Sequence, residues 1–132
     1  MGILRRCFSA RTAPVLLWVL GITVFFRGAA LSLFTRVIGD DGDGQLIVSL
    51  HEHWYRVMRG LEGWNETLFF HPFKHALGYS DTFFATGLLY SVLRHFGLDQ
   101  FLALQGVYLL LATLGYGSMY LWLHRYRGLG RL

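Results

Sequence analysis

Two long apolar stretches lie near the two ends of the chain, and the polar residues are concentrated between and outside them. The first covers residues 14–38 and is interrupted by Arg27 and Arg36, and the second covers 101–124. A helix crosses a bilayer with about 20 mainly apolar residues. The pattern therefore predicts one transmembrane helix over each stretch.

The segment 45–64 repeats apolar residues at spacings of three and four, which predicts an amphipathic helix that lies on the membrane. Glu52 and Arg56 stand four residues apart on its polar face, so we expect them to pair. The apolar face consists of Ile47, Leu50, Trp54, Val57 and Leu61.

A shorter apolar helix is predicted over 81–96, with Asp81 or Ser80 capping its start. Its uncharged part ends at Arg94 and is too short for a full crossing. It is therefore expected to be a re-entrant or interfacial helix.

Composition and charge agree with a membrane protein. The chain is 54% hydrophobic and 15% charged, whereas a soluble domain has about 25% charged residues. The basic residues gather at the two ends, and such residues favour the cytoplasmic side. We expect an all-α integral membrane module, multi-pass in the membrane, with both termini cytoplasmic and residues 39–100 forming an external loop.

Three alternatives bear on this class. A cleaved signal peptide is the alternative for the first stretch, but its apolar run continues past Arg27. The arginines form no basic face interleaved with aromatic residues, so nucleic acid is not an expected partner, and the lipid bilayer is. The single cysteine, Cys7, excludes an internal disulfide and a multi-cysteine zinc site.

The acidic residues of the external loop cluster just after the first stretch, at Asp40, Asp41 and Asp43. An EF-hand does not fit, because Leu50 stands where that loop needs its twelfth ligand, Glu. Two interpretations stay open. Asp and Gly are good turn residues, and clustered carboxylates also bind hard divalent cations or remove a proton.

Other candidate residues carry weaker signals. Arg27 lies inside an apolar stretch, where a charge is costly, so we expect it either to pair with a carboxylate or lipid phosphate or to snorkel to an interface. His51 and His53 point to different sides of a helix. His71 and His75 are four apart, but Pro72 between them argues against a helix.

Several short motifs of the external loop resemble the first external loop of large bacterial integral membrane proteins of the GT-C superfamily, which are polytopic glycosyltransferases. The resemblance covers most of the chain, from about Arg11 to Gly128. It is carried by Asp43-Gly44-Gln45-Leu46, His53-Trp54-Tyr55-Arg56, Gly60, Phe69-Phe70-His71-Pro72, Leu77-Gly78-Tyr79-Ser80-Asp81 and Gly97-Leu98-Asp99.

The resemblance implies a bacterial inner-membrane location and transfer of a sugar from a lipid-phosphate donor. It implies a catalytic aspartate, Asp43 or else Asp40 or Asp41, with Asp41 and Asp43 as ligands if Mg²⁺ or Mn²⁺ assists. Contacts to a lipid-linked sugar are assigned by charge alone. They fall on Lys74, His71, His75 and Arg27.

The chain departs from the GT-C pattern in having two predicted spans, whereas those enzymes have many more. It is therefore expected to be an N-terminal module that needs further transmembrane segments to form a donor cavity. The alternative is a small non-catalytic membrane protein that packs against a larger membrane partner through the glycine-bearing helix over 101–124.

Overall fold

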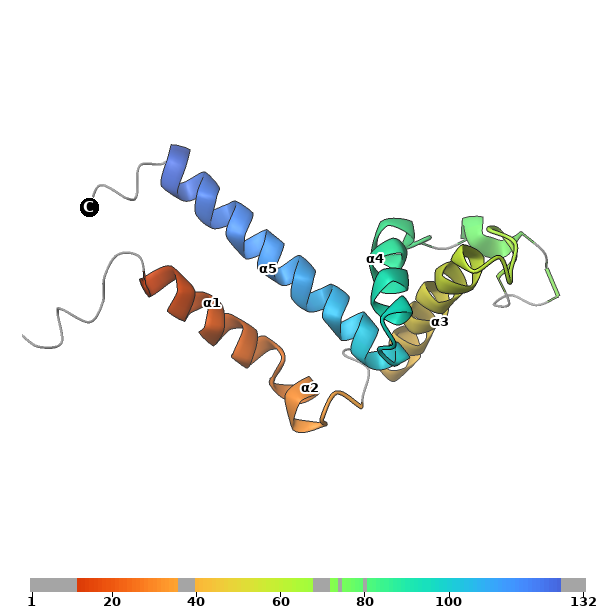
Figure 1. Cartoon of the computed structure of the whole chain (residues 1–132), viewed down its shortest axis with the longest axis horizontal. Helices are drawn as coiled ribbons and strands as arrows, with labels where there is room; N and C mark the ends of the chain where they lie inside the picture. Colours follow the sequence, from red (N-terminus) through yellow and green to blue (C-terminus); the bar gives the residue numbers. More distant parts are fainter. Residues whose placement is uncertain (1–11, 36–39, 68–71, 74, 80, 127–132) are drawn as a thin grey trace, which may run out of the picture.

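The structure is a computed structural model, and it describes residues 12–35, 40–67, 72–73, 75–79 and 81–126 (Figure 1). This part of the chain is helical and contains no strand, which confirms the predicted all-α fold. The elements follow the order α1, α2, α3, the short 3₁₀ helix η1 (Ala76–Tyr79), α4 and α5.

The first apolar stretch forms two helices in place of one, α1 (Thr12–Phe25) and α2 (Arg27–Leu31), joined at Phe26. The chain then turns, with Leu33 at φ 51° and Phe34 at φ 61°. The Phe34 amide donates to the Ala29 carbonyl, a bond typical of a helix end that turns through a left-handed residue. Glycine normally takes that position, so no residue pattern indicated that the helix ends here. Residues 36–39 lie outside the described part.

Helix α3 (Asp41–Met58) begins earlier and ends earlier than the predicted 45–64 helix. It begins earlier because the Asp40 side chain caps it by accepting the Gly42 amide. It ends at Met58 because Gly60, at φ 69°, reverses the chain while its amide and that of Leu61 bond back to the last turn.

Helix α4 (Phe84–His95) confirms the predicted short apolar helix but not its cap. Phe83 occupies the capping position in a left-handed conformation (φ 47°), without a side-chain cap. Contacts with α3 hold this start: the Trp54 Nε1 donates to the Thr82 carbonyl at 2.5 Å, and the Trp54 and Phe84 rings lie 4.9 Å apart.

Helix α5 (Gln100–Tyr126) contains the second predicted span. The Asp99 carboxylate accepts the amides of Phe101 and Leu102 and so caps it. Among the described helices, α5 is the one that is long and apolar enough to cross a membrane by length and composition, whereas α1 is apolar but has only 14 residues.

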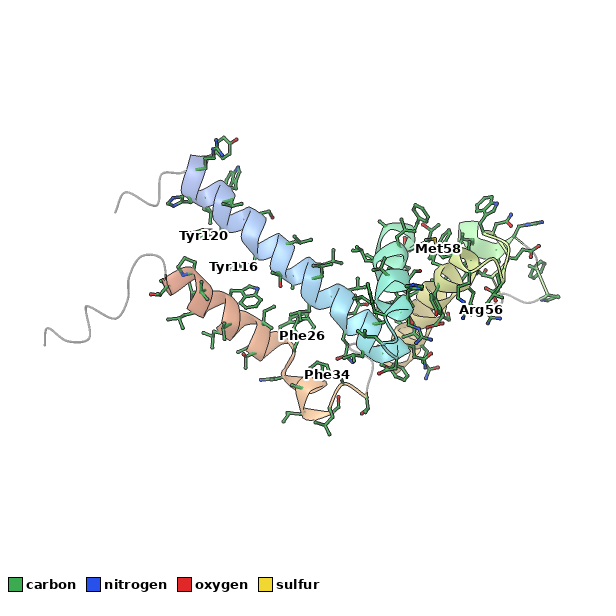
Figure 2. The ribbon with its side chains drawn as sticks, viewed as in Figure 1. Phe26, Phe34, Arg56, Met58, Tyr116 and Tyr120 are labelled. Carbon is green, nitrogen blue, oxygen red and sulfur yellow. The ribbon has the colours of Figure 1, made fainter. Side chains whose placement is uncertain are left out.

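Helices α1 and α5 run antiparallel beside each other, and α3 runs across their direction at the far end (Figure 1). Two bonds fix this pairing. The Tyr116 hydroxyl donates to the Pro14 carbonyl at 2.6 Å, and the Gln105 amide donates to the Phe34 carbonyl at 3.2 Å. Phe26, which is buried, lies between the two helices with Tyr116 (Figure 2).

The buried core lies where α3, α4 and the start of α5 meet. One cluster joins Val48, Tyr90, Ala103, Leu104 and Val107. Gly106 allows α4 and α5 to pack closely beside this cluster, because a Cβ at Gly106 would lie 2.9 Å from the Leu93 side chain. A second cluster, of Leu50, Trp54 and Leu77, packs η1 against α3. The rest of α5 and all of α1 expose most of their large apolar side chains.

Candidate functional site

The acidic residues expected to be catalytic lie at the start of α3. Asp40 is its N-cap, Asp41 is its first residue, and Asp43 is exposed in its first turn. Carboxylates are favourable there because the helix dipole is positive at its N-terminus. The geometry thus gives Asp40 a structural role, and it leaves the side chain of Asp43 in solvent.

The other expected substrate contacts are scattered. Arg27 is exposed at the start of α2, and His75 is exposed just before η1 with φ 60°. His71 and Lys74 lie outside the described residues. Across the described ranges, no group of three or more His, Cys, Asp or Glu side chains is placed to hold a metal ion.

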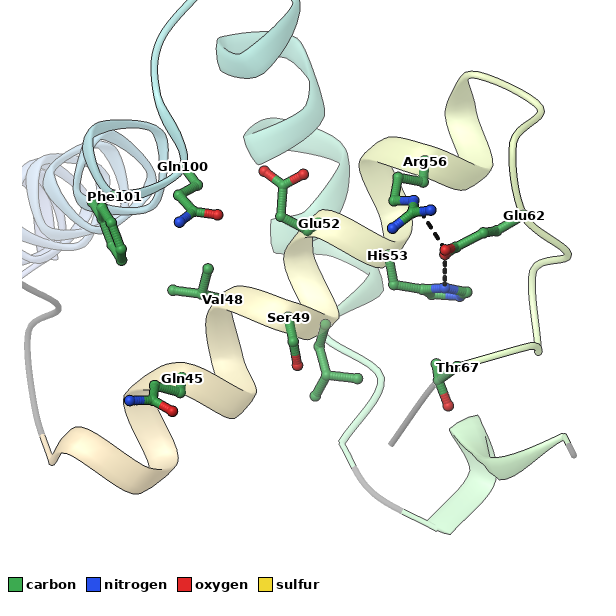
Figure 3. Close-up of a pocket in the computed structure, with 11 residues that line it drawn as sticks. Gln45, Val48, Ser49, Glu52, His53, Arg56, Glu62, Thr67, Gln100 and Phe101 are labelled. Atoms are coloured by element: carbon green, nitrogen blue, oxygen red, sulfur yellow. Dashed lines mark hydrogen bonds and ion pairs between the residues drawn. The ribbon is translucent and has the colours of Figure 1, made fainter. Parts of the chain in front are cut away.

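A pocket of about 360 Å³ lies along one side of α3, where sequence reasoning placed no site (Figure 3). Its walls come from α3, from the loop that follows α3, and from the start of α5. Its polar lining includes Gln45, Glu52, His53, Arg56, Glu62 and Thr67.

One wall of the pocket is a chain of three charged or polar side chains. The Nδ1 of His53 lies 3.0 Å from a Glu62 carboxylate oxygen, and the Nε of Arg56 lies 2.9 Å from the other oxygen. The Nε2 of His53 lies 3.0 Å from the Trp64 carbonyl oxygen. These contacts fasten the loop 59–67 to α3.

Behind the pocket, Glu52 joins α3 to α4. Its carboxylate accepts the hydroxyl of Tyr90, and the Arg94 Nε lies 2.6 Å from the same oxygen, aligned as an ion pair rather than a hydrogen bond. The Arg94 guanidinium also lies over the Tyr55 ring. Burial, and then the bond to Glu52, raise the pKa of the Tyr90 hydroxyl above its ordinary value.

These pairings correct the expected pair between Glu52 and Arg56. The two residues share a helix but bind different partners, Arg94 and Glu62 respectively. Each of those partners comes from another segment, so spacing along one helix did not reveal them. A usable signal was present nevertheless: Glu52, Glu62 and Arg94 are charged residues in a chain with few charges.

His51 and His53 behave independently, as their positions on the helix predicted. The Nδ1 of His51 lies 2.7 Å from the Ile47 carbonyl oxygen, and its Nε2 lies 3.0 Å from the Thr86 hydroxyl. Burial lowers the pKa of His51, and the bond to Ile47 offsets part of that effect. His51 is therefore a satisfied core side chain.

A second pocket, of about 610 Å³, lies between the turn after α2 and the start of α5. Leu33, Phe34, Phe101 and Leu102 give it an apolar lining, and Arg94 and Asp99 add charge. Neither pocket is lined by Arg27, His75, Asp40 or Asp43. The described structure thus does not gather the expected site residues into one cavity.

Comparisons with protein families, with curated proteins and with solved structures found no match for the chain.

Proposed function

We propose that the chain is the N-terminal module of a membrane glycosyltransferase-like protein that resembles the GT-C superfamily. In this proposal α5 crosses the bilayer, α1 and α2 make the other crossing, and α3 and α4 lie at the external face. Both ends of the chain are then cytoplasmic. Further transmembrane segments complete the cavity for a lipid-linked sugar.

The observation that carries the proposal is the placement of the motif-bearing segment. The resemblance falls on residues that include Asp43, His53 and Arg56, and α3 carries all three. This helix runs across the direction of the antiparallel α1–α5 pair at one end of that pair (Figure 1). A helix so placed suits the outer surface of a membrane that α5 crosses.

The exposed apolar residues support the same arrangement. Along α1, Leu17, Leu20 and Val24 are exposed, and along α5 so are Leu110, Leu114 and Leu121. Such a surface is unfavourable in water but is matched by lipid or by other apolar helices. The basic residues outside these helices favour the cytoplasmic side.

The proposed chemistry places Asp43 as the general base, with Asp40 and Asp41 as the other candidates. The carboxylate removes a proton from an acceptor hydroxyl while that oxygen attacks the sugar and the lipid phosphate leaves. A divalent cation such as Mg²⁺ or Mn²⁺, bound by Asp41 and Asp43, would stabilise the phosphate charge. Exposure of Asp43 at a helix start leaves it accessible to such partners.

The test uses the complete reading frame, found by sequencing the gene beyond codon 132. Transfer from a radiolabelled lipid-linked sugar is measured in membranes for Asp43→Asn, and we expect a loss of about 10²–10⁴-fold. Asp99→Asn, at the cap of α5, is the matched control for folding, because Asn caps a helix about as well as Asp. Unchanged transfer in Asp43→Asn, Asp41→Asn and Asp40→Asn would rule out the catalytic assignment.

A second candidate function is a non-catalytic membrane protein that packs against a larger partner. It is favoured by the open surface of α5 at Gly115 and Gly117, where a Cβ would meet nothing within 4 Å. A partner that docks there should be lost from detergent co-purification when either glycine becomes leucine. Retained activity of the complete protein in both variants would favour the first function.

A further inference from the structure

Both ring nitrogens of His53 face oxygen atoms that act only as acceptors. The Nδ1 lies 3.0 Å from a Glu62 carboxylate oxygen, and the Nε2 lies 3.0 Å from the Trp64 carbonyl oxygen. A neutral imidazole carries one N–H and one lone pair. With a neutral His53, the lone pair of one ring nitrogen would face an acceptor oxygen, and both atoms would be buried without a hydrogen bond. Such an arrangement costs free energy.

Two protonation arrangements satisfy both contacts. Either His53 is an imidazolium that donates from both nitrogens, or Glu62 is protonated and donates to Nδ1. Arg56 decides between them, because its Nε lies 2.9 Å from the second oxygen of Glu62 and favours the ionised carboxylate. In both arrangements, the closed loop holds one proton more than a neutral histidine beside a free carboxylate.

His51, two residues earlier, shows that the number of ring protons a histidine needs depends on its hydrogen-bond partners. Its Nδ1 can donate to the Ile47 carbonyl while the Thr86 hydroxyl donates to its Nε2. A neutral ring is then fully satisfied. His53 has no such hydroxyl, because one of its partners is a carboxylate and the other is a backbone carbonyl.

The charged groups around His53 come from two segments. On α3 these are Glu52, which is paired with Arg94, and Arg56. On the loop it is Glu62, which lines the pocket with His53. Glu66 packs on Gly63 in the same loop. Within the described ranges, Glu62 is the carboxylate that contacts the His53 ring.

The loop 59–67 forms a wall of the pocket on α3, and one of its buried groups destabilises the closed position. Glu62 and Thr67 both line the pocket, and the loop leaves α3 through the left-handed Gly60. The closed loop buries the Thr67 hydroxyl without a hydrogen-bond partner among the described residues, which opposes closure. The contacts of His53 must outweigh this cost.

We propose that residues 59–67 form a proton-dependent wall of the pocket on α3. The wall is closed while His53 carries two ring protons and opens when one is lost. Because the closed state binds the additional proton, raising the pH favours opening. This device does not depend on the proposed glycosyl transfer, and it sets when the pocket is enclosed.

The experiment uses the full chain in detergent micelles. Hydrogen exchange of residues 61–67, expressed as protection factors to remove the intrinsic pH effect, is measured between about pH 6 and pH 8.5, where a histidine ordinarily titrates. In parallel, ¹⁵N spectra of labelled histidines report whether both ring nitrogens are protonated, and the His53 signals are identified by their loss in His53→Gln.

We expect the protection of the loop to fall by up to about tenfold per pH unit, the limit for one proton, as the imidazolium signals of His53 disappear. In Glu62→Gln, the amide donates to a neutral His53 and still accepts from Arg56. Loop protection should then change by less than about twofold over the same range, since closure needs no additional proton.

His95→Gln, at an exposed histidine of α4, is the matched control and should keep the wild-type pH response. Three results would overturn the proposal. These are a singly protonated His53 ring at pH 6 in the wild type, protection of the wild-type loop that does not change with pH, and a wild-type slope retained in Glu62→Gln. The second needs no variant to fold.

Discussion

The α1–α5 pair and the α3–α4 unit are held together by different means. Between α3 and α4 there are a buried tryptophan, a closely packed glycine and an ion pair that includes Glu52. Between α1 and α5 there is a tyrosine hydroxyl on a backbone carbonyl, and α1 has no buried residue within its own bounds. The first unit is built like a small protein core, and the second relies on its surroundings.

This difference predicts in which region a substitution should lower the free energy of unfolding. In the α3–α4 unit, packing and hydrogen bonding within the chain determine stability, so changes there should lower the free energy of unfolding. In the outward faces of α1 and α5, the same type of change removes contacts with lipid or with other helices. Matched substitutions in the two regions test this distinction.

The largest effect is expected from Trp54→Ala compared with Trp122→Ala. Trp54 is 6% exposed and Trp122 is 48% exposed. Loss of the buried ring should lower the free energy of unfolding by about 3–5 kcal/mol, whereas the exposed site should change it by about 0.5 kcal/mol or less. Denaturant unfolding in micelles, followed by circular dichroism, measures both, and equal losses would contradict the distinction between the regions.

A smaller effect is expected from Gly87→Ala compared with Gly115→Ala. A Cβ at position 87 would lie 2.5 Å from the Trp54 ring, so overpacking should cost about 1–3 kcal/mol. At Gly115 nothing lies within 4 Å, and alanine should stabilise the helix by up to about 1 kcal/mol. Thermal unfolding of the two variants under one condition gives the signs, and a stabilised Gly87→Ala would show that α3 and α4 are less tightly packed.

The smallest effect should be graded with pH and confined to the α3–α4 unit. Because burial lowers the pKa of His51 in the folded state, the unfolded chain binds more protons just below the ordinary histidine value of about 6.5. Stability contributed by this site is thus present above that pH and is lost as the pH falls towards the folded pKa. Circular dichroism during denaturant unfolding at several pH values measures this.

The control for this pH effect is His51→Gln, which should flatten the acid-side loss. The effect has the opposite sign to that proposed for His53, where acid favours the closed loop. Exchange data for residues 61–67 and the pH dependence of unfolding therefore separate the two histidines. A loss that persists unchanged in His51→Gln would assign it to another group.

Sequence patterns predicted the elements that depend on local chemistry. The period of the apolar residues predicted α3, and apolar stretches predicted α4 and α5. The ends of α3 carried signals in Asp40 and Gly60 that the predicted 45–64 helix did not use. The break in the first apolar stretch was not predictable in this way. Leu33, Phe34 and Phe83 adopt left-handed conformations that such residues rarely take without tertiary contacts.

The pocket on α3 was less accessible to sequence reasoning than the helices were. The tie between His53 and Glu62 depends on how Gly60 turns the chain back, and the tie between Glu52 and Arg94 joins two helices. Local spacing instead favoured a pair within α3. The acidic start of α3 was noticed as a cluster, but its capping geometry depended on where the helix begins.

The order of the helices along the chain has a consequence for synthesis. The described contacts of α1 are with α2 and α5, and α5 leaves the ribosome after every other described helix. The partners α3 and α4 follow each other closely and can pair before α5 is made. The first apolar helix must therefore wait until the helices between it and α5 have been made, which requires the membrane or a targeting factor to shield it in the meantime.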